Sequence, residues 1–139
     1  MREEEKLIEE VCKKIKEIGK IGEDEKQKLY EVFGKRFRNA LKALDEEAIK
    51  KYVFKPSGRT VWIVVGKERD YEVIPLVGYC SCDDFYFRVL SGSVFLCYHV
   101  IAQKLAEALG KYEVIEEEDS FYEVLMKEWR FISESNPSD

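Results

Sequence analysis

The segment Cys80-Ser81-Cys82 is followed, after fourteen further residues, by Cys97-Tyr98-His99. These twenty residues hold three of the chain's four cysteines and its only histidine. Three thiolates and one imidazole at this spacing suit a single tetrahedral zinc ion. A site with four protein ligands leaves no open position for water or substrate. The sequence therefore predicts a structural zinc site rather than a catalytic one.

The elements on either side of this motif are expected to converge on the ion. Because side chains alternate along a strand, the first two cysteines share a face if residues 73–82 are extended. His99 stands near the start of an apolar periodic stretch that predicts a helix with Gly110 as its C-cap. Ala102 lies one turn after His99. Its small side chain allows the helix to approach the metal end of the sheet.

The pattern Cys80-x-Cys82 … Cys97-x-His99-x-x-Ala102 resembles the SWIM zinc finger in its extended form, which carries the trailing alanine. The motif covers residues 80–102, and a looser resemblance to small, stand-alone archaeal members reaches back to about residue 51. The extended form marks the SWIM subunits of Shu-type complexes, which work with RecA-like recombinase paralogues in homologous-recombination DNA repair. The four-ligand motif implies one zinc per chain as cofactor, and the resemblance implies a recombinase paralogue as partner. Because the site is closed, we expect no enzymatic activity.

Other interpretations of the cysteines fit less well. The four residues could instead be reduced cysteines and a hydrogen-bonded histidine within an ordinary core. That interpretation would not explain why cysteine and histidine, which are scarce in this chain, cluster together. The first residues, Met1-Arg2-Glu3-Glu4-Glu5, are too charged for a signal peptide, and no apolar run reaches membrane-spanning length. We therefore expect a cytoplasmic protein without a membrane segment, in which thiols stay reduced. Cys12 stands outside the motif and is expected to behave as a small hydrophobic residue.

The whole sequence predicts an α+β fold: N-terminal helices, a small antiparallel sheet, a zinc-stapled finger and C-terminal helices. Apolar periodicity predicts two N-terminal helices, over residues 3–18 and 23–44. Strands are expected over residues 51–54, 60–65 and 69–75. We divide the chain into an N-terminal helical region (1–48), a sheet plus zinc finger (49–112) and a C-terminal helical extension (113–139).

The segment between the two halves of the motif is rich in aromatic residues. Asp83 and Asp84 are placed to cap a short helical turn. Its apolar residues are Phe85, Tyr86, Phe87, Val89 and Leu90. They favour a miniature core around the ion, and a base-stacking platform is the alternative.

Charge is unevenly placed along a chain whose net charge is −5. Residues 26–69 hold twelve Lys and Arg against five Asp and Glu. This basic region either meets a phosphate backbone or forms a solvated face that offsets the acidic C-terminal third. Binding to single-stranded or duplex nucleic acid would be weak, salt-sensitive and without sequence preference. The candidate contacts are Lys35, Arg36, Arg38, Lys42, Lys51, Lys55 and Arg59.

The C-terminal segment is the stronger candidate for a protein interface. Ser120 and Glu123 form a capping-box pattern ahead of a predicted amphipathic helix. Its candidate partner contacts are Phe121, Tyr122, Leu125, Trp129 and Ile132. This stripe would dock on a recombinase paralogue or on a second copy of the chain, as a homodimer. The alternative is that it packs on its own domain.

Three classes of function therefore compete: an adaptor, a nucleic-acid-binding module and an enzyme. An enzyme has the least support, because the sequence has no second histidine for general-base work. It also lacks a phosphate-binding glycine-rich motif and a nucleophile signature.

Overall fold

The computed structural model describes residues 3–90 and 96–130, and their fold is α+β, as the sequence predicted. The helices are α1 (Glu3–Ile18), α2 (Glu23–Phe33), α3 (Lys35–Asp45), α4 (Asp83–Leu90), α5 (Tyr98–Leu109) and α6 (Tyr122–Arg130). The strands are β1 (Ile49–Lys55), β2 (Thr60–Val65), β3 (Asp70–Ile74), β4 (Tyr79–Cys80) and β5 (Glu113–Glu118). A 3-10 turn, η1 (Asp119–Phe121), precedes α6.

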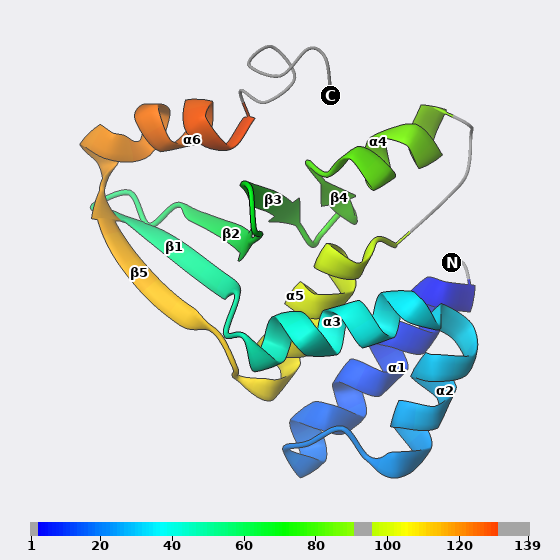
Figure 1. The fold of residues 1–139 in the computed structure, drawn as a ribbon. Coiled ribbons are helices and arrows are strands. Elements are labelled where there is room, and N and C mark those ends of the chain that lie inside the picture. The colour runs from blue at the N-terminus through cyan, green and yellow to red at the C-terminus, as the bar shows by residue number, and fades with distance from the viewer. Residues whose placement is uncertain (1–2, 91–95, 131–139) are drawn as a thin grey trace.

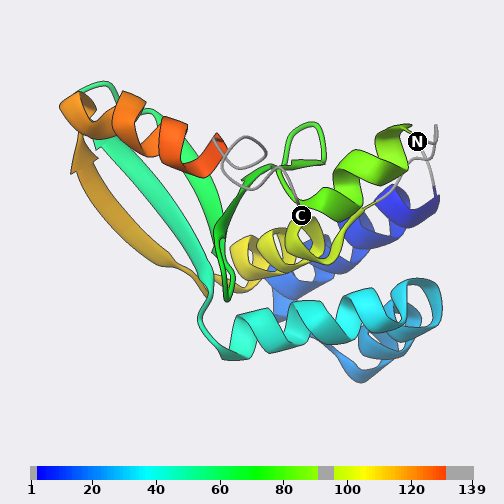
Figure 2. The ribbon, with the colours of Figure 1, turned by 45° about the horizontal axis from the view of Figure 1, so that its top comes forward.

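The five strands form one sheet in the order β4-β3-β2-β1-β5. All neighbours are antiparallel except β1 and β5, which run parallel. Helix α5 packs on one face of the sheet, α1 and α3 pack on α5, and α2 packs on α1 and α3. These four helices form the helix layer, and α6 lies against the other face of the sheet (Figures 1 and 2).

Strand β2 explains why both faces of the sheet are covered. Its sequence, Thr-Val-Trp-Ile-Val-Val, is a continuous apolar run rather than an alternating one, as in strands buried on both faces. Trp62 and Val64 belong to the core shared with the helix layer, whereas Val61 and Ile63 belong to a second core beneath α6. The metal motif lies on the helix-layer side.

The prediction of one continuous helix over residues 23–44 is wrong, because Gly34 divides it into α2 and α3. Gly34 has φ 55° and ψ −121°, a conformation that residues with a Cβ rarely adopt. Its N–H still donates to the Tyr30 carbonyl at 2.9 Å, closing α2. Phe33 and Phe37 on either side of the break are both buried in the helix-layer core.

Residues 73–82 are not one extended segment, so the condition under which strand alternation would place Cys80 and Cys82 on one face is not met. Strand β3 ends at Ile74, the chain turns through residues 75–78, and β4 returns antiparallel with Val73 paired to Cys80. Gly78 has φ 70°, which suits this turn to glycine. Cys82 therefore lies beyond the strand, just before α4, and strand alternation is not what brings the two cysteines together.

Residues 113–118 form strand β5, although the sequence predicted a helical extension over residues 113–139. Lys50 pairs with Glu113 in the ladder, and Lys50 Nζ lies 2.7 Å from Glu113 Oε1. Opposite charges on neighbouring strands offset the low strand propensity of glutamate.

Across residues 3–90 and 96–130, the helices are all too short or too polar to span a membrane.

Candidate metal centre

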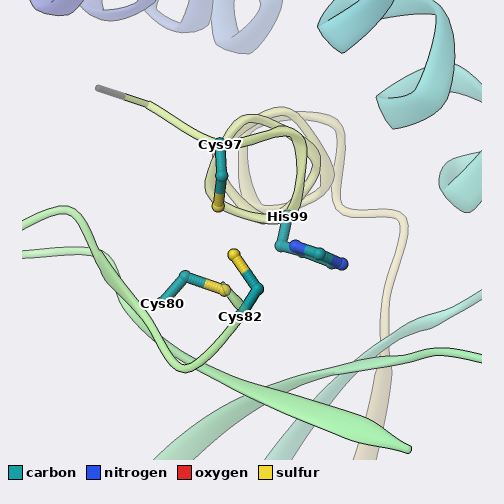
Figure 3. Close-up of side chains that lie close together, drawn as sticks. All are labelled: Cys80, Cys82, Cys97 and His99. Atoms are coloured by element: carbon teal, nitrogen blue, oxygen red, sulfur yellow. The ribbon is translucent and has the colours of Figure 1, made fainter. Parts of the chain in front are cut away.

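The structure brings together the four predicted ligands, Cys80, Cys82, Cys97 and His99, and buries all of them. One ligand atom from each residue lies within 4.8 Å of the others. The three sulfur atoms converge and the His99 ring lies beside them (Figure 3). Ligand atoms around a tetrahedral zinc with Zn–S bonds of about 2.3 Å lie about 3.8 Å apart. The cluster therefore has the dimensions of a zinc site.

Two ligands come from the end of the sheet, and two come from the start of helix α5. Cys80 is the last residue of β4, and Cys82 follows two residues later. Cys97 is the N-cap of α5, and His99 lies in the first turn of that helix. Gly110, in the left-handed conformation with φ 71°, ends α5 as predicted. The site thus joins the end of the sheet to the start of α5.

Two of the three sulfurs lie at helix N-termini. The N–H of Phe85 in α4 donates to Cys82 Sγ at 3.4 Å. Cys97 is the N-cap residue of α5, so its Sγ lies at the N-terminal end of that helix. Free N–H groups and the helix dipole favour negative charge at these positions. Both helices therefore stabilise the thiolate form that binds a metal.

The three thiols compete for protons in a buried space. Hydrogen bonds from Cys80 and Cys97 lower the pKa of the Cys82 thiol. Hydrogen bonding to Cys82, together with burial, raises the pKa of Cys80. The buried thiols thus share their protons unequally, and Cys82 is the one that ionises most readily. A bound dication would replace those protons and allow all three sulfurs to act as ligands.

His99 shows the clearest requirement for a bound ion. Both its ring nitrogens are buried, and neither has a hydrogen-bond partner within the described residues. The rings of Tyr71 and Tyr98 pack against the imidazole, with centroid separations of 4.2 and 3.9 Å. Leaving a buried polar nitrogen unpaired is costly, and coordination satisfies one of the two. The residues present therefore fit zinc, which prefers such sulfur and nitrogen donors.

Ser81, between the first two ligands, holds the Cys-Ser-Cys segment against β3, and sequence reasoning missed this role. Its hydroxyl accepts a hydrogen bond from the Glu72 N–H at 2.9 Å. Its own N–H donates to the Glu72 carbonyl at 3.0 Å. The only sequence signal was a small polar residue between two ligands.

The residues flanking the ligands are divided between core and surface. Ala102 is fully buried, and Phe85 packs partly buried against the helix-layer core. Tyr86 and Phe87 are instead exposed on α4, at 60% and 64%. The predicted miniature core therefore includes Phe85, and the side chains of Val89 and Leu90 lie outside the described residues.

The candidate nucleic-acid contacts occupy two separated places: α3, and strand β1 with the turn that follows it (Figures 1 and 2). Lys35, Arg38 and Lys42 are exposed on α3, and Lys55 is exposed at the end of β1. The remaining three make contacts within the chain. Arg36 binds Glu4 through both Nη atoms, at 3.1 and 2.6 Å, and donates to the Leu96 carbonyl at 2.7 Å. Lys51 Nζ lies 5.4 Å from the centre of the Trp62 ring, and Arg59 Cζ lies 4.6 Å from that of Tyr122.

The structure does not leave Trp129 exposed as a partner anchor. Its side chain is 4% exposed, in the core beneath α6, and its ring centroid lies 4.8 Å from that of Tyr52. Tyr122 and Leu125 are partly buried against the same core. Phe121 is exposed, and Ile132 lies outside the described residues. Trp129 thus packs on its own domain because the apolar face of α6 covers the second face of the sheet.

A buried cluster of three cysteines and one histidine at the junction of a sheet and a helix defines a zinc-finger protein. The chain is 40% identical over 106 residues to the "Zinc finger SWIM domain-containing protein 7 homolog" of Dictyostelium discoideum, covering 74% of this chain and 67% of that protein. It is 30% identical over 131 residues to "Zinc finger SWIM domain-containing protein 7" of Mus musculus, covering 92% and 86%. An uncharacterized protein of Archaeoglobus fulgidus is 34% identical over 90 residues, covering 65% and 67%.

The chain therefore belongs to the family of zinc finger SWIM domain-containing protein 7, and it is a zinc-binding SWIM protein. No family model and no solved structure matches it.

Proposed function

We propose that this protein binds one structural zinc ion and acts as a non-catalytic, cytoplasmic adaptor for a RecA-like recombinase paralogue in homologous-recombination DNA repair. The observation that carries this proposal is the closed, fully buried ligand cluster in a chain of the SWIM family. The partner is the one implied by the resemblance to the SWIM subunits of Shu-type complexes.

Zinc in this site stabilises structure. Cys80, Cys82, Cys97 and His99 would hold the ion and so fasten the end of the sheet to α5. When bound, zinc would neutralise thiolate charge and fix ligand positions, as closed four-ligand sites do. The protein's task is then to present a surface rather than to transform a substrate.

Exposed apolar side chains on the segments before and after the Cys80–Cys82 motif support a protein partner. Leu76 and Val77, in the turn between β3 and β4, are 93% and 72% exposed. Tyr86 and Phe87 are exposed on α4, which lies beside β4 (Figure 1). Apolar groups exposed together often mark interaction sites, and aromatic residues are enriched in interface cores. We therefore place the paralogue contact on the turn and α4 rather than on Trp129.

Nucleic-acid binding is the second candidate, and one observation favours it. Lys35, Arg38 and Lys42 follow each other at three- and four-residue spacing, so these exposed cations share one face of α3. A short basic face of this kind supports weak, salt-sensitive contact with a phosphate backbone. It forms a smaller basic surface than the seven residues that the sequence suggested, because Arg36, Lys51 and Arg59 contact the chain itself.

Co-purification of the chain with co-expressed recombinase paralogues from the same genome tests the adaptor proposal. Leu76→Asp combined with Phe87→Asp should abolish the complex while zinc content and melting temperature stay unchanged. Val124→Asp is the matched control, because Val124 is 63% exposed on α6, against the other face of the sheet. Absence of any complex with the unaltered chain would refute the adaptor role.

Titration of single-stranded DNA at several salt concentrations tests the second candidate. Lys35→Glu, Arg38→Glu and Lys42→Glu together should remove DNA binding and leave the paralogue complex intact. DNA binding that is unaffected by this triple change would exclude the basic face of α3.

A further inference from the structure

Within the described residues, three buried side-chain nitrogen and oxygen atoms have no hydrogen-bond partner. Two are the ring nitrogens of His99 and the third is Oε1 of Gln103. Gln103 is fully buried, and it lies one helical turn after His99 on the same side of α5. A zinc ion accounts for one of the three atoms, and two remain to be explained.

The orientation of the Gln103 amide is determined by Glu107. Gln103 Nε2 donates to Glu107 Oε1 at 3.0 Å. An ionised carboxylate only accepts hydrogen bonds, so the NH₂ group of the amide must face Glu107. The amide oxygen is therefore turned away from Glu107 and requires a donor inside the core.

Among the described residues, His99 holds the only buried side-chain nitrogens that lack a hydrogen-bond partner, so it is the candidate donor in the zinc-bound protein. When one ring nitrogen coordinates the metal, the other carries a hydrogen and must donate it. The three ligand cysteines lose their protons on binding zinc, so they offer no S–H group to an amide oxygen. The unmatched donor of His99 and the unmatched acceptor of Gln103 thus lie one turn apart on one helix.

We propose that Gln103 is a positioning residue for the zinc site: its Oε1 accepts a hydrogen bond from the His99 ring nitrogen that does not bind the metal. This inference rests on the proposed zinc binding. His99, Gln103 and Glu107 follow each other at four-residue spacing along α5. The hydrogen bonds then run from the metal ligand through the amide to a surface carboxylate.

This arrangement determines which tautomer of His99 binds zinc and how its ring is oriented. Glu107 fixes the amide, the amide fixes the ring N–H, and the other nitrogen is left to coordinate. Such outer partners of a metal-bound histidine typically change metal affinity by about 10–100-fold when they are removed.

Gln103→Met is the decisive variant, because methionine has a similar length and no hydrogen-bond acceptor of comparable strength. Competition with a chelator of known affinity should show zinc binding weakened by about 10–100-fold. The melting temperature of the metal-free protein should not fall, since an unpaired amide oxygen has been removed from the core. Leu105→Met, on another side of α5, is the matched core control and should leave zinc affinity unchanged.

Nitrogen NMR of the zinc-loaded, unaltered chain gives a second measurement that does not depend on a variant. We expect a single His99 tautomer whose non-ligating nitrogen keeps its proton and exchanges slowly with solvent. The resonance should shift in Gln103→Met and, to a smaller extent, in Glu107→Ala.

Zinc bound with unchanged affinity and an unshifted His99 resonance in Gln103→Met would overturn the inference while leaving the zinc site intact. The same result is expected if Gln103 Oε1 binds a buried water molecule instead of the His99 ring N–H. Failure of the unaltered chain to bind zinc would instead refute the proposed function itself.

Discussion

Arg130, the last residue of α6, binds the carboxylate of Glu72 on β3 through two hydrogen bonds. Arg130 Nε lies 2.8 Å from Oε1 and Nη2 lies 2.9 Å from Oε2. Glu72 is 3% exposed, and its backbone also pairs with Ser81 between the first two metal ligands. One strand residue therefore links α6 on one face of the sheet to the metal motif on the other.

Arg130→Met should destabilise the fold by about 1–3 kcal/mol, because it leaves a buried carboxylate without its charged partner. The arginine side chain is itself half-exposed, so solvent weakens the pair and the lower part of this range is expected. Denaturant unfolding measures the change. Adding Glu72→Gln should recover part of the loss, whereas strictly additive effects would show that the two side chains do not interact.

Trp129→Ala should destabilise the fold by about 3–5 kcal/mol, since it empties part of the core beneath α6. The nearby exposed Val124 gives a control on the same helix, and Val124→Ala should change stability by no more than about 0.5 kcal/mol. Thermal unfolding of both variants provides the comparison. Loss of a partner with unchanged stability in Trp129→Ala would restore the tryptophan as an interface anchor.

The local sequence predicted the ligand set and the helix that carries His99. Cysteine and histidine are scarce in this chain, so their clustering had few competing explanations. The start of α5 at the third ligand and its end at Gly110 follow from apolar spacing and a glycine C-cap, which are both short-range signals.

The features that the sequence missed depend on long-range contacts. Strand β5 is rich in glutamate, and it becomes a strand through its pairing with the lysines of β1. The apolar stripe of α6 would have the same sequence pattern whether it bound a partner or packed on the chain's own sheet. It packs on the sheet because the second face of β2 is also apolar and needs to be covered. The apolar periodicity runs unchanged across Gly34, although the helix itself breaks there. The spacing of apolar residues therefore gave no sign of the break.

Elemental analysis of the purified protein should show about one zinc per chain. X-ray absorption should show three sulfur ligands, one nitrogen and no oxygen, because four protein groups complete a tetrahedral shell. An oxygen ligand would mean an open coordination position and would revive the catalytic interpretation.

Cys97→Ser or His99→Ala should abolish stoichiometric zinc binding and lower the melting temperature. Zinc contributes about 10–16 kcal/mol of apparent binding energy in small finger peptides. The loss here should be partial, because α1, α2 and α3 share a core that includes many residues outside the site. Hydrogen exchange should show faster exchange around residues 79–90 and at the start of α5, with α1 and α3 protected. Full zinc content and unchanged melting would contradict the ligand assignment.

Cys12 provides a test of pH dependence outside the metal site. Burial raises the pKa of its thiol from 9.0 to about 11. In the folded protein at pH 8 the thiolate fraction is thus about 100-fold lower than for a free thiol, and alkylation should be slower by a similar factor. The folded protein holds this proton more tightly than the unfolded chain does. The free energy of unfolding is therefore unaffected by Cys12 below pH 9 and decreases as the pH rises from 9 towards 11.

Mass spectrometry after timed alkylation at pH 8 distinguishes the two kinds of cysteine. In the zinc-loaded protein all four should react slowly, the three ligands because zinc holds them and Cys12 because it is partly buried and its thiol pKa is raised. A chelator should release Cys80, Cys82 and Cys97 for reaction while Cys12 stays slow, and denaturant should make all four reactive. Rapid labelling of Cys12 in the folded protein would show that its thiol is accessible and ionised. Unchanged labelling of the other three after chelation would show that zinc does not protect them.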